Sequence, residues 1–200
     1  MFTGIVQGTT KVKKVEHQSG LIILTLDLGE LARGLSEGAS VSVAGVCLTA
    51  RALRGGRVIF DLMDETLKKT TLGSLRVGDK VNIERSVKIG DELGGHRVAG
   101  HVSGTAAIAK VATPPGNRIL TIKCARPWMD YILPKGFIAL DGCSLTVVDA
   151  GRDFFTVHLI PETLRRTTLG EKKAGDLVNL ELDPQTVAVV ETVKRLGYRG

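Results

Sequence analysis

The chain has 200 residues, of which 43% are hydrophobic and 24% are charged, and its formal net charge is +6. This composition is ordinary for a globular protein, and no apolar run approaches the roughly 18 residues that a membrane-spanning helix needs. Basic residues are scattered in short pairs and aromatic residues make up only 4% of the chain, so we expect no nucleic-acid-binding surface and no membrane partner.

Taken in chain order, the first half shows short segments of alternating apolar and polar residues. Residues 24–28, 41–43, 58–62 and 81–84 have this pattern, which predicts strands with one buried face. Glycine turns separate them, as at residues 54–57 and 77–79. Such strands predict a small closed barrel or a sandwich, and short helical pieces are expected at residues 30–35 and 65–72.

The second half repeats the first. Residues 60–84 and 157–181, aligned at an offset of 97, are identical at thirteen of twenty-five positions. Residues 45–49 correspond to residues 142–146, and residues 3–9 correspond to residues 99–105. A duplication of this length predicts two copies of one domain, residues 1–96 and 97–183, and therefore two similar pockets.

The remaining segment, residues 184–200, has no counterpart in either repeat. Val187, Val190, Val193 and Leu196 lie on one stripe at helical spacing, and Pro184 suits a helix start. A short β-branched helix needs a surface to pack against. That surface is either its own domain or another subunit, and we expect the second.

The cysteines and histidines do not have metal-site or disulfide spacing. Cys47, Cys124 and Cys143 are an odd number without a CxxC pair. His96 and His101 lie five residues apart without an acidic or cysteine partner at ligand spacing, so no metal is expected. The chain start lacks the basic segment and cleavage site of a signal peptide, which indicates a cytoplasmic protein.

Polar residues that differ between the repeats can mark a division of labour between two pockets. The divergent pairs are Cys47 with Ser144, His101 with Ile5, His158 with Asp61, and Pro161 with Asp64.

Four motifs together resemble the riboflavin synthases. They are MFTGIV at residues 1–6, GGHRVAGHV at residues 94–102, SLTV at residues 144–147 and IPETL at residues 160–164. The resemblance covers essentially the whole chain. It implies an all-β fold of two tandem six-stranded Greek-key barrels with a C-terminal helix, assembled as a homotrimer.

The resemblance also implies a reaction. Two molecules of 6,7-dimethyl-8-ribityllumazine dismutate by transfer of a four-carbon unit, giving riboflavin and 5-amino-6-(D-ribitylamino)uracil. No metal or redox cofactor is implied. The site would lie between the N-terminal barrel of one subunit and the C-terminal barrel of its neighbour, and association with lumazine synthase is a further expectation.

Among the implied catalytic residues, His101 ranks first because an imidazole titrates near neutral pH and a proton must leave the lumazine 7-methyl group. The Cys47 thiol is expected to bind a ring carbonyl or to attack C7 transiently, with a buried apolar cysteine as the alternative. Ser144 and Thr146 offer hydroxyls that orient a ring or activate a water. Phe2 is expected near the reacting pair, or as a plug at a sheet edge.

The implied substrate-binding residues come from matching segments of the two repeats. In the first repeat they are Gly4, Ile5, Val6, Cys47, Leu48, Thr49, Asp61, Leu62, Met63, Asp64, Glu65 and Thr66. In the second repeat they are Gly100, His101, Val102, Ser144, Leu145, Thr146, His158, Leu159, Ile160, Pro161, Glu162 and Thr163, and Lys135 is expected to reach across the subunit boundary.

Two of these assignments rest on residue chemistry as well. Gly4 and Gly100 would allow the backbone to approach a flat ligand closely. Glu65 and Glu162 would bind ribityl hydroxyls, or would only stabilise helix starts.

Two other classes of protein remain open. Lumazine proteins share the two-domain architecture but are non-catalytic chromophore carriers, and a generic β-barrel interaction module is the third reading. The retained polar residues of both pockets favour an enzyme. Cys143, which precedes Ser144, is expected to be a packing residue.

Overall fold

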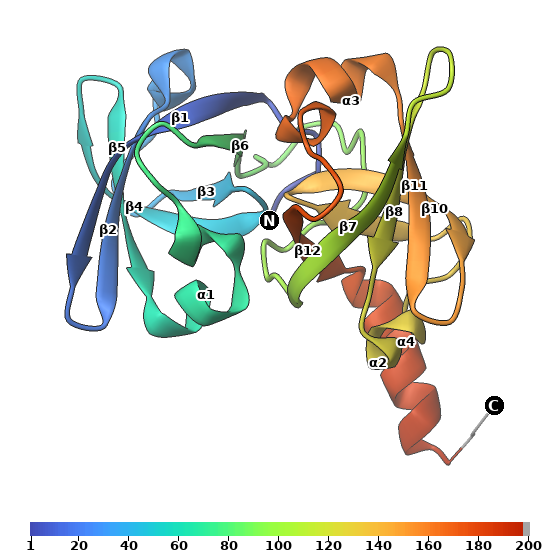
Figure 1. Ribbon diagram of the computed structural model, residues 1–200. Helices are drawn as coiled ribbons and strands as arrows, with labels where there is room; N and C mark the ends of the chain where they lie inside the picture. The colour runs from blue at the N-terminus through green and yellow to red at the C-terminus, as the bar shows by residue number, and fades with distance from the viewer. Residues whose placement is uncertain (198–200) are drawn as a thin grey trace.

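The first half of the chain forms one closed antiparallel barrel in the computed structural model, which describes residues 1–197 (Figure 1). Its strands pair in the order β1-β2-β5-β4-β3-β6, and β6 closes the barrel against β1. The strands are β1 (Gly8–Gln18), β2 (Leu21–Asp27), β3 (Ser40–Val43), β4 (Val46–Arg54), β5 (Arg57–Met63) and β6 (Lys80–Arg85).

The second half forms a second closed barrel with the same strand order, as the duplication predicts. Matching β7 to β1 and continuing along the chain reproduces every pairing of the first barrel. The strands are β7 (Gly104–Ala112), β8 (Arg118–Lys123), β9 (Phe137–Leu140), β10 (Cys143–Ala150), β11 (Phe154–Leu159) and β12 (Leu177–Leu182). The expected all-β fold of two six-stranded barrels is confirmed.

Each barrel is filled by the inward-facing residues of its alternating strands. Leu24 and Leu26 of β2 are buried, whereas Thr25 between them is half-buried. Phe60 occupies the first core and Phe155 the second, both without exposed surface. Burial of such a side chain stabilises the fold by about 1.5–3 kcal/mol. The two phenylalanines belong to separate hydrophobic clusters, so each barrel has a core of its own.

Strands β6 and β12 depart from the alternating pattern because their outer faces meet the opposite barrel. Asn82 of β6 is buried, and its Nδ2 donates to the carbonyl of Asp141 at 2.9 Å. The Asn82 Oδ1 accepts from the backbone N–H of Thr168 at 2.8 Å. A buried amide with both of its ends bonded fixes the two barrels relative to each other.

Asn179 of β12 makes the reciprocal bonds to the first barrel. Its Nδ2 donates to the carbonyl of Ala44, and its Oδ1 accepts from the N–H of Thr71, both at 2.8 Å. Between these clamps Gly45 and Gly142 lie back to back, and a Cβ on Gly45 would lie 2.5 Å from the Gly142 nitrogen. The two halves are therefore related by an approximate two-fold axis at these glycines.

The short helices differ in part from the sequence prediction. The helix expected at residues 30–35 is only a 3-10 turn, η1 (Gly29–Ala32). The one expected at residues 65–72 divides into α1 (Asp64–Lys69) and η2 (Thr71–Ser74), because Thr70 is extended and its hydroxyl accepts from the Leu72 N–H. The second barrel has their counterparts α2 (Arg126–Met129), α3 (Pro161–Arg166) and η3 (Thr168–Gly170).

The C-terminal helix, α4 (Pro184–Arg195), begins where the sequence predicts. Its cap is Asp183, whose carboxylate accepts from the Thr186 N–H at 2.9 Å. Val187 packs on the second barrel, whereas Val193 and Leu196 are 43% and 70% exposed. Figure 1 shows α4 running away from the second barrel. Residues 198–200 of the predicted segment lie outside the described residues.

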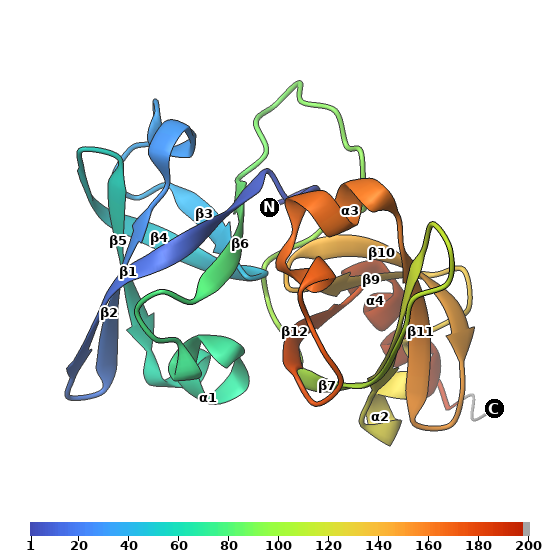
Figure 2. The same ribbon diagram turned by 45° about the horizontal axis from the view of Figure 1, so that its top comes forward.

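The chain ends of the two repeats cross between the barrels. Figure 2 shows the segment after β6 looping over the junction, with the N-terminus beside it. The Phe2 N–H donates to the Val98 carbonyl at 2.7 Å, and the Val98 N–H donates to the Phe2 carbonyl at 3.1 Å. These two residues and Ala139 form a small separate core between the barrels.

Within the described part of the chain, no helix is both long and apolar enough to cross a membrane.

Candidate active site

The first candidate site is built where the segment before β7 crosses to the first barrel. The Cys47 N–H donates to the Gly100 carbonyl at 2.9 Å, so His101 is held beside β4. Gly100 has a φ of +80°, and a Cβ there would lie 2.6 Å from the Cys47 Cβ. Only glycine permits this approach.

This crossing makes one wall of a pocket of about 260 Å³, which we call the N-barrel pocket. Six predicted site residues line it, together with Val46, Lys69 and Thr70, which the sequence reasoning missed. The predicted ones are Cys47, Glu65, Thr66, Gly100, His101 and Val102. None of the described residues that line this pocket belongs to a strand of the second barrel.

The second candidate site is the equivalent crossing at β10. The Ser144 N–H donates to the Gly4 carbonyl at 2.8 Å. Gly4 has a φ of +74°, and a Cβ there would lie 2.5 Å from the Ser144 Cβ. The side on which a Cβ would stand is thus filled by the chain itself at Gly4 and Gly100, and their contact with a ligand stays a prediction.

His96 is a site residue that the sequence reasoning missed. Its Nδ1 lies 2.6 Å from the Ser144 Oγ, and its ring stacks on Phe137 with centroids 5.1 Å apart. Burial lowers the pKa of His96 below its usual 6.5, and the charge of Asp183 opposes this effect. The imidazole is therefore neutral near pH 7. Its Nε2 is buried without a hydrogen-bond partner in residues 1–197.

Phe2 lies behind the N-barrel pocket. Its ring has no exposed surface and packs with Cys47 and Val98. A Cβ on Gly100 would lie 3.0 Å from its ring. Phe2 therefore supports the crossing from behind and is not among the residues that line the pocket, and its catalytic role stays a prediction.

The other predicted residues of the first repeat are divided between core and surface. Leu48, Leu62 and Val6 belong to barrel cores, and Ile5 is 46% exposed. Ion pairs hold three of the predicted carboxylates: Asp61 to Arg51 at 2.9 Å, Asp64 to Lys68 at 3.9 Å, and Glu65 to Lys69 at 2.6 Å. Met63 and Thr49 are exposed.

In the second repeat, Leu145 and Leu159 are core residues. Thr146 is exposed opposite Phe137 on β9, and His158 is exposed with its Nδ1 3.1 Å from Asn117 Nδ2. Ile160 is 62% exposed just before α3, which starts with Pro161, Glu162 and the half-buried Thr163. The exposed Lys135 has a φ of +67° in the turn before β9.

Glu65 and Glu162 both lie in the first turn of a helix, where a carboxylate is stabilised by the helix dipole. A hydrogen bond from Lys69 lowers the pKa of Glu65, and hydrogen bonds from Arg165 and Arg166 lower the pKa of Glu162. Both are ionised acceptors, and Glu65 also lines the N-barrel pocket.

The three thiols are free and differ in their surroundings. Burial raises the pKa of Cys124 to about 11 and that of Cys143 to about 12. Cys143 is 6% exposed within the second core, which confirms it as a packing residue. Cys47 is half-buried at the N-barrel pocket.

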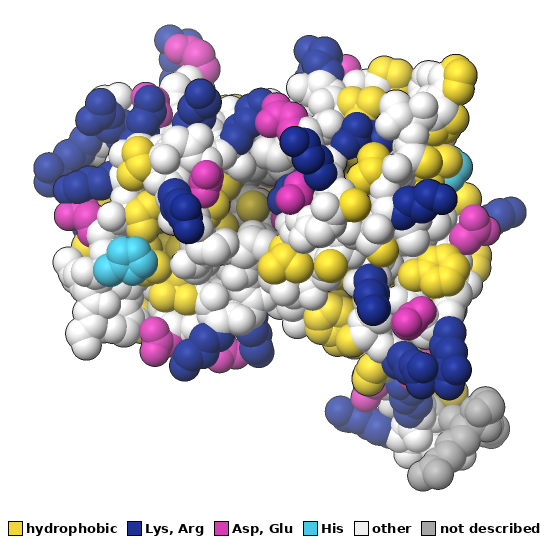
Figure 3. All heavy atoms as spheres, in the orientation of Figure 1, with side chains coloured by type: hydrophobic (Ala, Val, Ile, Leu, Met, Phe, Trp, Pro, Cys, Tyr) yellow, Lys and Arg dark blue, Asp and Glu magenta, His cyan; other side chains and the backbone are white. Residues whose placement is uncertain are grey.

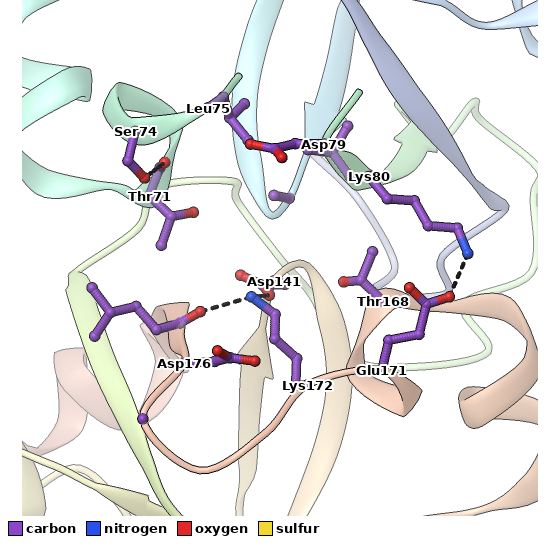
Figure 4. A pocket seen from close by; sticks show the side chains of 14 residues that line it. Thr71, Ser74, Leu75, Asp79, Lys80, Asp141, Thr168, Glu171, Lys172 and Asp176 are labelled. Atoms are coloured by element: carbon purple, nitrogen blue, oxygen red, sulfur yellow. Dashed lines mark hydrogen bonds and ion pairs between the residues drawn. The ribbon is translucent and has the colours of Figure 1, made fainter. Parts of the chain in front are cut away.

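A larger cavity of about 530 Å³ lies between the barrels, away from the predicted site residues (Figure 4). Four of its charged side chains form two ion pairs. The Lys172 Nζ lies 3.4 Å from the buried Asp141 carboxylate, and the Lys80 Nζ lies 2.5 Å from Glu171. The Lys80–Glu171 pair joins the two barrels across this cavity, whereas the Lys172–Asp141 pair lies within the second barrel.

The surface charges agree with the composition. On the face in Figure 3, Lys and Arg side chains alternate with Asp and Glu and do not form one continuous basic patch. Across residues 1–197, no group of three or more His, Cys, Asp or Glu side chains could hold a metal ion.

Comparison with known proteins identifies both halves. The family model described as "Lumazine binding domain" matches residues 3–86 and again residues 99–183. LumP complexed with riboflavin has a TM-score of 0.85 and 27% identity to this chain, covering 92% of this chain and all of LumP. LumP complexed with 6,7-dimethyl-8-(1'-D-ribityl) lumazine has a TM-score of 0.83 and 25% identity, covering 92% of this chain and 99% of LumP.

Curated relatives are more similar in sequence. Riboflavin synthase of Escherichia coli (strain K12) is 51% identical over 98% of this chain and 93% of its own length. Riboflavin synthase of Chlamydia pneumoniae is 44% identical over 98% of this chain and 96% of its own length.

The two barrels with their crossing segments define a protein of tandem lumazine-binding domains. The near full-length identity to curated enzymes goes further: the chain belongs to the riboflavin synthase family and is an enzyme.

Proposed function

We propose that the protein catalyses the dismutation of two 6,7-dimethyl-8-ribityllumazine molecules into riboflavin and 5-amino-6-(D-ribitylamino)uracil. The observation that supports it is one crossing geometry built twice with unlike groups. Cys47 and His101 stand at one crossing, and Ser144 and His96 stand at the equivalent one. Two identical substrates that play different parts, donor and acceptor of four carbons, need such a pair of sites.

The atoms of two lumazines equal the atoms of the two products, so the reaction has no net oxidation and needs no external redox partner. What the protein must supply is placement and proton transfer. Orientation of two reactants can lower a barrier by about 7–11 kcal/mol. A positioned general acid or base adds about 10²–10⁴-fold.

Each polar residue then has a part in the mechanism. His101, exposed at the N-barrel pocket, removes a proton from the 7-methyl group of one lumazine. The Cys47 thiol lies beside it and binds or attacks that ring. At the other crossing, neutral His96 accepts the Ser144 proton, so that the serine oxygen or a water that it orients adds to the second ring.

We further propose that the two pockets meet between subunits. Within residues 1–197, no strand of the second barrel lines the N-barrel pocket, which supports a partner pocket from a neighbouring chain. The exposed Val193 and Leu196 of α4 offer an apolar surface that a homotrimer would bury. Residues 1–96 and 97–183 are then the two substrate-binding domains, each completed by the crossing segment of the other, and residues 184–200 hold the subunits together.

In this arrangement the exposed Lys135 reaches the neighbouring subunit's pocket, and the α1 and α3 segments bind the ribityl chains through Glu65 and Glu162. We expect the enzyme in the cytoplasm, where its association with lumazine synthase remains a prediction.

Turnover tests the proposal. The purified protein is mixed with 6,7-dimethyl-8-ribityllumazine without added cofactor, and riboflavin and lumazine are quantified by chromatography. We expect one riboflavin for every two lumazines consumed. Binding without turnover, as in a chromophore carrier, or a different ratio of product to substrate would contradict the proposal.

A further inference from the structure

Two buried carboxylates hold the crossing segments from behind. Glu84 on β6 and Glu181 on β12 occupy equivalent positions of the repeat and are 3% and 4% exposed. An almost fully buried carboxylate is costly unless its oxygens are hydrogen-bonded. Burial raises the pKa of both groups, although backbone N–H donors oppose this effect.

The bonds of Glu181 go to the segment that carries His101. Its two carboxylate oxygens accept from the Ala99 N–H at 2.7 Å and from the Gly100 N–H at 2.9 Å. On its other side the same segment is bonded to Cys47 through the Gly100 carbonyl. The His101 backbone is thus fixed between a carboxylate of its own barrel and a strand of the other.

The bonds of Glu84 go to the N-terminal segment in the same way. One oxygen accepts from the Thr3 N–H at 2.7 Å and the Thr3 hydroxyl at 2.8 Å, and the other accepts from the Gly4 N–H at 3.1 Å. The Gly4 carbonyl in turn accepts from the Ser144 N–H. Among the described residues, Glu181 therefore bonds only to the crossing segment at the N-barrel pocket, and Glu84 bonds only to the crossing segment at Ser144.

We infer that Glu181 is a positioning residue that holds His101 against Cys47 in the N-barrel pocket, and that Glu84 does the same for the crossing at Ser144. Neither carboxylate is assigned contact with substrate. Their role in turnover rests on the proposed function, whereas their structural effect on each crossing does not.

The physical reason is that a carboxylate is acceptor-only, so two adjacent N–H groups can both bond to it. In Glu181→Gln one of the two acceptor oxygens is replaced by an NH₂ donor, which faces the N–H of Ala99 or Gly100. Because two donors cannot bond to each other, the segment that carries His101 must shift. A shift of about 1 Å at a reacting group can cost about 100-fold in rate.

The test compares Glu181→Gln with Glu84→Gln, which is the same change at the equivalent position of the other repeat. The first readout is independent of turnover: the imidazole resonances of His101 and His96 in NMR spectra of the full chain. We expect Glu181→Gln to shift the His101 resonances and leave those of His96, and Glu84→Gln to do the reverse. Shifts of both histidines in both variants, or of neither, would overturn the inference.

The second readout is kinetic. We expect kcat of Glu181→Gln to fall by about 100-fold, with a smaller change in KM. Glu181→Asp keeps two acceptors and should recover part of this loss, which a packing defect would not. If either Gln variant fails to fold, the Asp variants are compared by the same resonances. A wild-type protein without turnover would end the proposed function but leave the resonance result decisive for the positioning role.

Discussion

The Ser144 hydroxyl lies 2.6 Å from Nδ1 of His96, a histidine held in its neutral form by burial. The equivalent position of the first barrel is Cys47, which has the exposed His101 beside it. The two equivalent crossings of the duplicated fold therefore carry different polar groups, a serine bonded to a histidine at one and a cysteine and a histidine lining a pocket at the other.

The buried His96 should make stability depend on pH. Its folded pKa is lowered from 6.5, so the unfolded chain binds the proton first as pH falls. The contribution of neutral His96 to stability is present above about pH 6.5, and it is lost as the pH falls through the lowered pKa of the folded state. We expect the free energy of unfolding, measured by denaturant titration, to decrease on acidification from about pH 7.5 to about 5.5 more in the wild type than in His96→Asn. Equal decreases of the free energy of unfolding in the two proteins would contradict a lowered pKa of His96 in the folded state.

His101 should control the rate of turnover. His101→Gln keeps a hydrogen-bonding side chain but cannot take up the 7-methyl proton. We expect kcat to fall by about 100-fold or more, with a smaller effect on KM. The control is His17→Gln, a change at an exposed histidine on β1. Equal activities of the two variants would exclude His101 as the base.

Gly100 should be needed for the fold of the crossing. Gly100→Ala places a Cβ within 2.6 Å of the Cys47 Cβ in addition to the strain of a φ of +80°. Gly38→Ala is the matched control, because Gly38 has a φ of +82° but open space around it. We expect about 1–2 kcal/mol of destabilisation from the strain alone in Gly38→Ala, and a larger loss in Gly100→Ala. Similar losses of unfolding free energy for the two variants in denaturant titrations would mean that the crossing segment moves to accommodate the added Cβ at little cost.

The thiols should differ in reactivity. Cys124 and Cys143 are buried with pKa values near 11 and 12, whereas Cys47 is half-buried at a pocket. Because the thiolate is the reactive form, iodoacetamide at neutral pH should modify Cys47 first. Peptide mass spectrometry identifies the site, and 6,7-dimethyl-8-ribityllumazine should protect it. Alkylation of Cys47 that is unaffected by the ligand would place the substrate elsewhere.

The exposed half of α4 should be needed for assembly. Val193→Lys puts a charge on the apolar surface but leaves the contacts of Val187 with the barrel intact. We expect light scattering to show a trimer for the wild type and smaller species for the variant, together with lower activity. Gln185→Lys, an exposed position in the first turn, is the control. If the Val193→Lys variant has the same size as the wild type in light scattering, the exposed part of α4 does not belong to the subunit interface.

The sequence predicted the barrels well because their signals are local. Alternation in segments such as residues 24–28 and the duplication at an offset of 97 were sufficient for two small β domains. The division of the segment at residues 65–72 was missed because it depends on the Thr70 hydroxyl, which caps the second turn in place of a continuous helix.

The site was predicted less completely, because it depends on contacts between the repeats. Cys47, His101 and Ser144 are indicated by the resemblance to the riboflavin synthases together with their divergence between the repeats. Divergence does not point to Glu84 and Glu181, because both repeats have glutamate at this position. His96 was missed because its partner Ser144 is 48 residues away in the chain.

Mixing of two inactive variants tests the central claim most directly. Cys47→Ala/His101→Gln disables the N-barrel pocket, and Ser144→Ala/His96→Asn disables the second crossing. If one site is made from the unlike pockets of two subunits, trimers that reassemble from a mixture of both chains contain an intact pair, and turnover should reappear. Activity in either variant alone, or none in the verified mixed trimers, would contradict a site shared between subunits.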